Sequence, residues 1–292
     1  MNNKHQQIRS PRQTLRSLVR LLVTNDYAWT LLRHTPAKSV PFVIRAREAS
    51  SARKHLDAIT KEAIAKVASR LTVLDGPFAG LRYPVATSVG SRLFPKLLGT
   101  YESELHALIE KVCKSSYSRV LDIGCAEGYY AVGLALRLPA TDIYAFDINP
   151  KALATCRALA AFNGVQDRIN LFGECTSETL RNLGDLPRSL IISDCEGYED
   201  QLFVADVVPS LRSHDCIIET HDFFGEPILK NLLSRFTPTH DCTVVSTTTA
   251  DAKLRGEAGS RLAMFQRDDQ ELLVSEGRPG PMTWLFAASR NS

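Results

Sequence analysis

One short segment carries the first chemical signal of the sequence. It reads Asp122-Ile123-Gly124-Cys125-Ala126-Glu127-Gly128 and lies between an apolar run and a helical pattern. Its two glycines, four residues apart, allow a tight turn and a close approach of a ligand to the backbone, because neither has a Cβ atom. The first N–H groups of a helix, expected here over 129–138, suit a carboxylate or a phosphate. The segment therefore predicts a ligand site at the end of a strand.

The acid that precedes the glycines narrows the choice of ligand. A dinucleotide fingerprint reads G-x-G-x-x-G, whereas this segment reads G-x-x-x-G after Asp122. A negative charge at that position disfavours a pyrophosphate. It favours a ligand that carries an ammonium or sulfonium group beside a carboxylate, and S-adenosylmethionine fits this description.

The same segment resembles motif I of the class I S-adenosylmethionine-dependent methyltransferases, in which an acid is followed by glycines two and six residues later. Ala126 stands where the family frequently has a central glycine. The resemblance implies that the cofactor contacts Asp122, Gly124, Cys125, Ala126 and Gly128.

Acids near the ends of other expected elements fit the same cofactor. Asp147 ends the second apolar run, where doubly wound folds place the acid that accepts hydrogen bonds from ribose hydroxyls. Ile148 would then lie beside the adenine. The resemblance further implies an acid near the adenine amino group, for which Glu174, next to Cys175, is the candidate. Glu102 is expected to border the cofactor, as similar residues do in the family.

The fourth and fifth apolar runs lead into residues that could move a proton. Residues 193–199 read Ser-Asp-Cys-Glu-Gly-Tyr-Glu and resemble the D-x-E-G-x-E segment of FkbM-like methyltransferases, which mostly O-methylate sugars and natural products. Residues 219–222 read Glu-Thr-His-Asp, similar to the E-x-H of that branch, and the fourth run does not lead into an N-P-P-Y loop of the type that serves planar amines. An alcohol acceptor needs a base. His221 is our first candidate because its ordinary pKa lies near neutrality, and Glu196 or Asp194 could replace it or orient it.

A metal-assisted reaction is the less favoured alternative. Asp194, Glu219 and Asp222 could supply oxygen ligands for Mg²⁺, which would lower the pKa of an acceptor hydroxyl. We expect no metal, because the FkbM-like branch is not generally marked by one and the sequence shows no dedicated ligand cage.

Alternating strands and helices must position these residues. Seven short apolar runs predict strands, and the clearest helix spans 150–163, with Asn149 as its N-cap and Gly164 at its end. Buried strands that alternate with helices predict a parallel sheet covered on both faces. The fold class is therefore α/β, a doubly wound, Rossmann-like, seven-stranded sheet of the class I methyltransferase type with an N-terminal helical extension. The runs lie at 120–123, 143–146, 169–172, 190–192, 216–218, 242–245 and 283–286.

The chain divides by composition into an arm and a catalytic domain. Residues 1–55 hold eleven Lys and Arg against two acids, a local charge of +9 that leaves −6 for the other 237 residues. We expect a basic arm with a helical extension over 1–72 and the methyltransferase domain over 73–292. Within these parts, the patterns predict a helix around 52–71 and a second helix capped by Thr100.

Cysteine spacing and hydropathy indicate the cellular compartment of the protein and whether it crosses a membrane. Seven cysteines without a C-x-x-C pair argue against a disulfide framework and a zinc site, which predicts a cytoplasmic protein. Cys125, Cys175 and Cys195 fall in predicted site loops, where we expect them to pack as small side chains. The sequence contains no run of about 18 apolar residues, so we expect no transmembrane helix.

The sequence thus predicts a methyltransferase that acts on the oxygen of a saccharide, glycan or small natural product. One alternative is an RNA methyltransferase that grips phosphates with the basic arm, although the acidic main domain argues against nucleic acid. Another is a non-catalytic, cofactor-binding regulatory scaffold. The arm could also contact a membrane surface.

Overall fold

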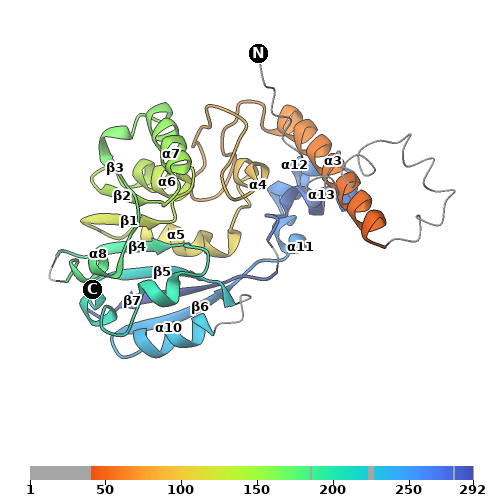
Figure 1. Cartoon of the computed structure of the whole chain (residues 1–292). Coiled ribbons are helices and arrows are strands. Elements are labelled where there is room, and N and C mark those ends of the chain that lie inside the picture. Colours follow the sequence, from red (N-terminus) through yellow and green to blue (C-terminus); the bar gives the residue numbers. More distant parts are fainter. Residues whose placement is uncertain (1–40, 185, 223–226, 279, 292) are drawn as a thin grey trace, which may run out of the picture. The chain divides into compact units, whose positions relative to one another are not determined.

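The computed structural model describes residues 41–184, 186–222, 227–278 and 280–291 (Figure 1). Most of the basic arm, residues 1–40, lies outside the described residues. Contacts divide the chain into two units, Met1–Glu62 and Ala63–Ser292. The long helix α3 (Pro41–Val67) contains most of the helix predicted at 52–71 and extends back to Pro41, the first described residue. No helix of the described part of the chain combines the length and apolar character needed to cross a membrane.

A seven-stranded sheet with the order β3-β2-β1-β4-β5-β7-β6 forms the centre of the second unit. Each strand contains one of the seven predicted apolar runs, so the α/β, Rossmann-like fold is confirmed. The strands are β1 (Arg119–Ile123), β2 (Asp142–Phe146), β3 (Ile169–Phe172), β4 (Ser189–Ser193), β5 (Asp215–Thr220), β6 (His240–Ser246) and β7 (Thr283–Ser289).

The sheet is mixed, and the prediction of an entirely parallel sheet is wrong. Strands β1 to β5 pair in parallel, whereas β7 is antiparallel to both β5 and β6. The reason lies in the connection, since Thr247 at the end of β6 and Met282 before β7 are hydrogen-bonded neighbours. Because β6 ends and β7 begins at the same end of the sheet, β7 must run in the opposite direction to β6.

Helices cover both faces of this sheet, as a doubly wound fold requires. On one face, Ile123 and Ile218 pack in a common core with Leu180, Leu202 and Phe236 of the helical layer. Helix α6 contacts β1, β2 and β3, and it covers the other face together with α7 (Figure 1). The bounds are α6 (Tyr129–Arg137), α7 (Pro150–Phe162), α8 (Ser177–Arg181), α9 (Glu199–Leu202) and α10 (Ile228–Phe236), with α4 (Leu93–Leu98), α5 (His106–Val112), α11 (Ala250–Lys253), α12 (Glu257–Leu262) and α13 (Arg267–Val274) before and after them.

Local signals predicted one helix end well and another poorly. At α7, the Asn149 side chain accepts a hydrogen bond from Lys151 N, Pro150 takes the first turn, and Gly164 adopts φ +70° beyond the end, which confirms the prediction. Thr100 is not an N-cap. Its hydroxyl donates to the carbonyl of Pro95, and the helix begins at His106 after a 3₁₀ turn.

Candidate active site

A cavity of about 630 Å³ opens at the carboxyl ends of the parallel strands. This volume falls within the range of small-molecule and cofactor sites, and the position is where open α/β sheets bind ligands. All of the predicted catalytic and cofactor-binding residues except Gly128 and Glu102 line this cavity. Residues that lie far apart in the sequence thus meet at one edge of the sheet.

The turn after β1 requires glycine at position 124. Gly124 adopts φ +81°, and a Cβ atom there would lie 1.7 Å from the carbonyl oxygen of Asp194. The N–H groups of Gly124 and Cys125 both donate to the carbonyl of Phe146, at 2.9 Å. The turn therefore draws the ends of β1, β2 and β4 together around the cavity.

Asp147 both faces the cavity and holds the turn in place. Its Oδ2 accepts a hydrogen bond from Ala126 N at 2.9 Å, and its Oδ1 accepts one from Asn149 N at 2.7 Å. Ala126 adopts φ +48°, a left-handed conformation that explains why glycine is frequent there in the family it resembles. The next side chain, Ile148, is 81% exposed and lines the cavity, so it can cover an aromatic ring.

Asp122 is a buried carboxyl group at the cavity wall. Its Oδ2 is buried and accepts no hydrogen bond from any described residue. Burial raises the pKa of Asp122 to about 7, against the lowering effect of a hydrogen bond from the Ala131 backbone. A positively charged group in the cavity would satisfy this carboxylate.

The loop after β3 and the cysteines complete the first half of the cavity. Glu174 is exposed at the rim, and Cys175 is buried beside it. A hydrogen bond with Cys156 and burial raise the pKa of Cys125, and burial likewise raises that of Cys195. These thiols stay protonated at neutral pH, so they pack as small side chains and are not nucleophiles.

Two predicted residues lie behind the cavity wall. Gly128 adopts φ +95° at the start of α6, and a Cβ atom there would lie 2.6 Å from Cys156 Sγ. It therefore permits close packing. Glu102 is buried and accepts hydrogen bonds from Tyr130 and Arg278, while the preceding residue, Tyr101, lines the cavity.

His221 lies among carboxylates at the part of the cavity wall that follows β4 and β5. Its Nε2 is 3.5 Å from Asp194 Oδ1 and 3.7 Å from both Glu196 Oε2 and Glu219 Oε2. Burial lowers the pKa of His221, but the hydrogen bond with Glu199 and the surrounding negative charges outweigh it, so the pKa is raised. The predicted triad of His221, Asp194 and Glu196 therefore meets in space.

Glu199 positions the histidine, a role that the sequence did not reveal. It is fully buried at the start of α9, and its Oε1 lies 2.7 Å from His221 Nδ1. The same oxygen accepts hydrogen bonds from the backbone of Cys195 and Gly197, at 3.2 and 3.3 Å. The only signal was its place as the second glutamate of the D-x-E-G-x-E segment.

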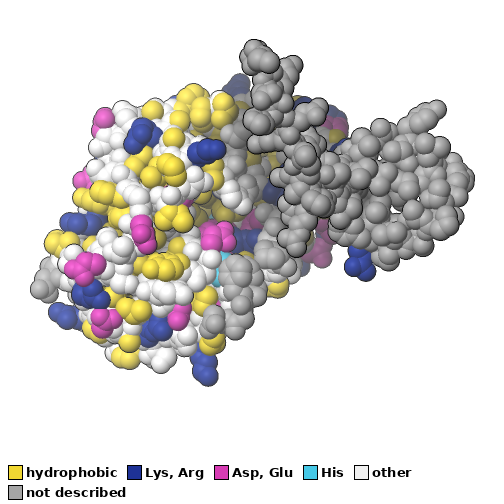
Figure 2. Space-filling view, viewed as in Figure 1, with side chains coloured by type: hydrophobic (Ala, Val, Ile, Leu, Met, Phe, Trp, Pro, Cys, Tyr) yellow, Lys and Arg dark blue, Asp and Glu magenta, His cyan; other side chains and the backbone are white. Residues whose placement is uncertain are grey.

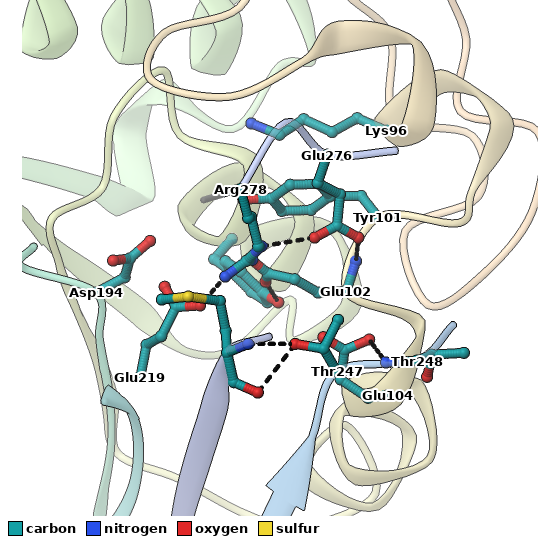
Figure 3. A network of polar contacts seen from close by, with 12 residues as sticks. Lys96, Tyr101, Glu102, Glu104, Asp194, Glu219, Thr247, Thr248, Glu276 and Arg278 are labelled. Carbon is teal, nitrogen blue, oxygen red and sulfur yellow. Dashed lines mark hydrogen bonds and ion pairs between the residues drawn. The ribbon is translucent and has the colours of Figure 1, made fainter. Parts of the chain in front are cut away.

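Arg278 joins three buried glutamates beside this wall, as Figure 3 shows. Its Nη1 donates to Glu219, its Nη2 to Glu102, and its Nε to Glu276 at 2.7 Å. Glu276 also binds Lys253 and accepts the backbone N–H of Glu102. No pattern in the sequence predicts these ion pairs.

A second buried ion pair lies on the side of α4. Lys96 Nζ lies 2.5 Å from Glu127 Oε1, and both side chains are almost fully buried. Glu127 also accepts hydrogen bonds from Ser88 Oγ and Val89 N, at 2.7 and 3.1 Å. Lys96 lines the cavity and lies 4.7 Å from the ring of Tyr101. Glu127 of the glycine turn therefore holds both α4, through Lys96, and the segment before α4, through Ser88 and Val89.

Asp222, weighed as a metal ligand, lies apart from these groups. It is exposed, and its Oδ1 accepts a hydrogen bond from Leu229 N at 3.2 Å. The residues that bring ligand atoms together are Asp194, Glu219 and His221, whose atoms all lie within 4.8 Å of one another.

Comparison with known proteins relates part of the chain to methyltransferases. Residues 114–201 match a family model described as a methyltransferase domain. The release factor glutamine methyltransferase of Cereibacter sphaeroides is 36% identical over 97 residues, which cover 31% of this chain and 35% of that protein. Ribosomal RNA small subunit methyltransferase C of a Shewanella species is 32% identical over 93 residues, 30% of this chain and 27% of that protein. The matches thus span about a third or less of these relatives.

Among solved structures, the precorrin-6y C5,15-methyltransferase of Geobacter metallireducens is similar with a TM-score of 0.40 and 14% identity, covering 64% of this chain and 86% of that chain. The strand order and the glycine turn agree with a class I methyltransferase fold, and the family match describes residues 114–201 as a methyltransferase domain. The FkbM-like assignment stays a prediction.

Proposed function

We propose that the chain transfers a methyl group from S-adenosylmethionine to an oxygen atom of a small-molecule or glycan acceptor. One observation carries the proposal. A single cavity has acids suited to the cofactor on one side, Asp122 and Asp147, and a histidine held by carboxylates on the other. Cofactor binding and proton removal therefore meet in one space.

The part of the cavity that contains Asp122 and Asp147 suits each part of the cofactor. Asp147 keeps lone pairs for ribose hydroxyls beyond the two backbone groups that it binds. Asp122 offers a buried carboxylate for the ammonium group. Ile148 would cover the adenine, and Glu174 at the rim would accept a hydrogen bond from the adenine amino group.

The second side suits a hydroxyl acceptor. The methyl group of a sulfonium is already activated, so the enzyme must mainly hold acceptor and donor in line. A hydroxyl must also lose its proton near the transition state. The loop after β4 supplies Asp194 and Glu196 near His221, and it contains no Asn-Pro-Pro-Tyr sequence.

Other acceptors remain as outcomes of the test. The names of the relatives point to protein glutamine and ribosomal RNA. On the face drawn in Figure 2, basic and acidic side chains of the described residues are intermixed, which gives little support to a phosphate-binding stripe. We therefore favour a glycan or small-molecule acceptor over RNA.

The decisive experiment incubates the full chain with methyl-labelled S-adenosylmethionine and separated glycan, small-molecule, lipid, RNA and protein fractions of a cell extract. We expect base-stable label in the glycan or small-molecule fraction. Label in RNA would refute a glycan or small-molecule acceptor and support an RNA methyltransferase. Cofactor binding without any label would favour a regulatory scaffold.

Two variants test the two sides of the cavity. Asp147→Asn should weaken binding of S-adenosylmethionine in calorimetry by about tenfold or more, because hydrogen bonds to a charged acceptor are lost. Asp142→Asn, at the exposed start of the same strand, is the matched control and should bind normally. His221→Ala should lower turnover and leave cofactor affinity nearly intact. Full activity of that variant would exclude His221 from the reaction.

A further inference from the structure

We propose that Asp194, Glu219 and His221 form a binding site for a divalent metal ion of the Zn²⁺ or Mn²⁺ type. The site lies at the carboxyl ends of β4 and β5, on the wall of the cavity that faces the acceptor side. This inference reverses our expectation of no metal, and it uses His221 in place of Asp222 beside Asp194 and Glu219.

The distances between the ligand atoms support an ion. His221 Nε2 lies 3.5 Å from Asp194 Oδ1 and 3.7 Å from Glu219 Oε2. Both separations exceed the usual length of a hydrogen bond. Ligands that bind one ion at about 2.1 Å stand about 3.0 Å apart in an octahedron and about 3.4 Å apart in a tetrahedron. All three ligand atoms lie within 4.8 Å of one another, so an ion can bind among them once the ligands move closer together.

The opposite ring nitrogen of the histidine supports the same conclusion. His221 Nδ1 lies 2.7 Å from Glu199, a fully buried carboxylate. Histidines that bind metals almost always donate their second ring N–H to a carboxylate or carbonyl, which fixes the tautomer and leaves the other nitrogen as the ligand. Glu199 therefore holds the ring with Nε2 directed at Asp194 and Glu219.

The carboxylates are also held ready for a cation. Arg278 binds Oε1 of Glu219, which leaves Oε2 on the side of His221. Oδ1 of Asp194 is buried and accepts no hydrogen bond from the described residues. Asp194, Glu196, Glu199 and Glu219 bring four carboxylates to one small region, against the guanidinium of Arg278. A divalent ion would offset this excess of negative charge.

The ligand set indicates the kind of ion. Two carboxylates and one imidazole suit Zn²⁺, Mn²⁺ or a similar ion, whereas Mg²⁺ prefers an all-oxygen octahedral shell that includes several waters. Three protein ligands leave coordination positions open, as catalytic sites do. If the proposed methyl transfer holds, those positions face the acceptor, and an alcohol bound there would lose its proton more easily. Glu196, exposed and near the same nitrogen, could then accept that proton.

The test measures binding of the metal without cofactor or acceptor. The full chain is stripped with a chelator and dialysed in parallel against Zn²⁺, Mn²⁺ and Mg²⁺, and retained metal is counted by mass spectrometry. We expect one Zn²⁺ or Mn²⁺ per chain, weaker retention of Mg²⁺, and a rise in melting temperature that grows with metal concentration. A chain that retains none of these ions, with an unchanged melting temperature, would overturn the proposal.

Variants locate the ion. Asp194→Asn, Glu219→Gln and His221→Gln should each weaken its binding at least about tenfold, and Glu199→Gln should do so about 10- to 100-fold through the histidine. Asp222→Asn, a neighbouring exposed acid outside the cluster, is the control and should bind normally. Equal binding by all five variants would place the ion elsewhere and refute the site. For any variant that fails to fold, the melting shift of the unaltered chain remains the deciding measurement.

The outcome for the metal site can be distinguished from the outcome for methyl transfer. Metal binding with no labelled product would leave the site intact and remove the proposed function. Labelled product from a chain that retains none of the three ions after dialysis would support the function, refute the metal site, and return His221 to the role of base.

Discussion

The carbonyl oxygen of Asp194 occupies the space that a Cβ atom on Gly124 would need, 1.7 Å from its position. This contact joins the turn after β1, which faces the cofactor side, to the loop after β4, which carries the acceptor side. Any side chain at position 124 must push the two loops apart. The glycine therefore sets the spacing between the two halves of the cavity.

Gly124→Ala should consequently destabilise the fold and abolish cofactor binding. The control is Gly164→Ala, because Gly164 also has a positive φ, of +70°, but nothing lies within 4 Å of its added Cβ atom. We expect the control to lose about 1 kcal/mol from backbone strain alone and Gly124→Ala to lose clearly more. Chemical denaturation measures both, and equal losses would show that the contact with Asp194 does not matter.

Ala126→Gly should act in the opposite direction. Ala126 adopts φ +48°, and a left-handed conformation costs an L-residue about 1–2 kcal/mol. Glycine removes this strain but loses more backbone entropy on folding, about 0.5–1 kcal/mol. We therefore expect a small gain in stability, about 0.5 kcal/mol, measurable as a shift of the denaturation midpoint with an unchanged slope. A clear loss of stability would mean that the turn is not strained.

The sequence predicted the elements that depend on local patterns. Each strand follows a buried apolar run, and α7 begins and ends at residues whose side chain or φ dictates it, such as Asn149 and Gly164. Asp122 and Asp147 were found for the same reason, since Asp122 lies within the first run and Asp147 directly follows the second. These signals are local, so neighbouring residues carry them.

The parts that the sequence did not reveal depend on contacts between distant residues. Arg278 meets Glu102 across 176 residues, and Lys96 meets Glu127 across 31. No periodicity links such positions, and a lone charged residue in a turn is ordinarily solvated. The direction of β7 was missed for a related reason, because an apolar run is the same in either direction.

Arg278→Gln should destabilise the protein far more than loss of an exposed ion pair. It would leave Glu102, Glu219 and Glu276 buried near one another without their shared cation, and a broken buried pair costs about 3–5 kcal/mol. The control is Arg290→Gln, whose pair with Asp241 is largely exposed and contributes about 1 kcal/mol or less. Urea denaturation compares them. Similar midpoints for the two variants would argue against an organising role of Arg278.

Binding of S-adenosylmethionine should strengthen as the pH rises from 6 to 7.5. Burial raises the pKa of Asp122 to about 7, a backbone hydrogen bond from Ala131 opposes this, and the charges of Asp194, Asp147 and Glu102 add to the rise. At pH 6 the carboxyl is mostly protonated and neutral in the empty cavity, whereas an ammonium group binds the ionised form.

A single group with this pKa weakens binding about eightfold at pH 6 relative to pH 7.5. The range stops at 7.5 because α-amino groups begin to lose their own proton at about pH 7.7–8.0. Calorimetric titrations at several pH values measure the effect. Asp122→Asn is the control, since an amide cannot ionise, and its affinity should be lower and nearly independent of pH. The same pH dependence in that variant would assign the titration to another group of the cavity and leave Asp122 without a role in holding the ammonium.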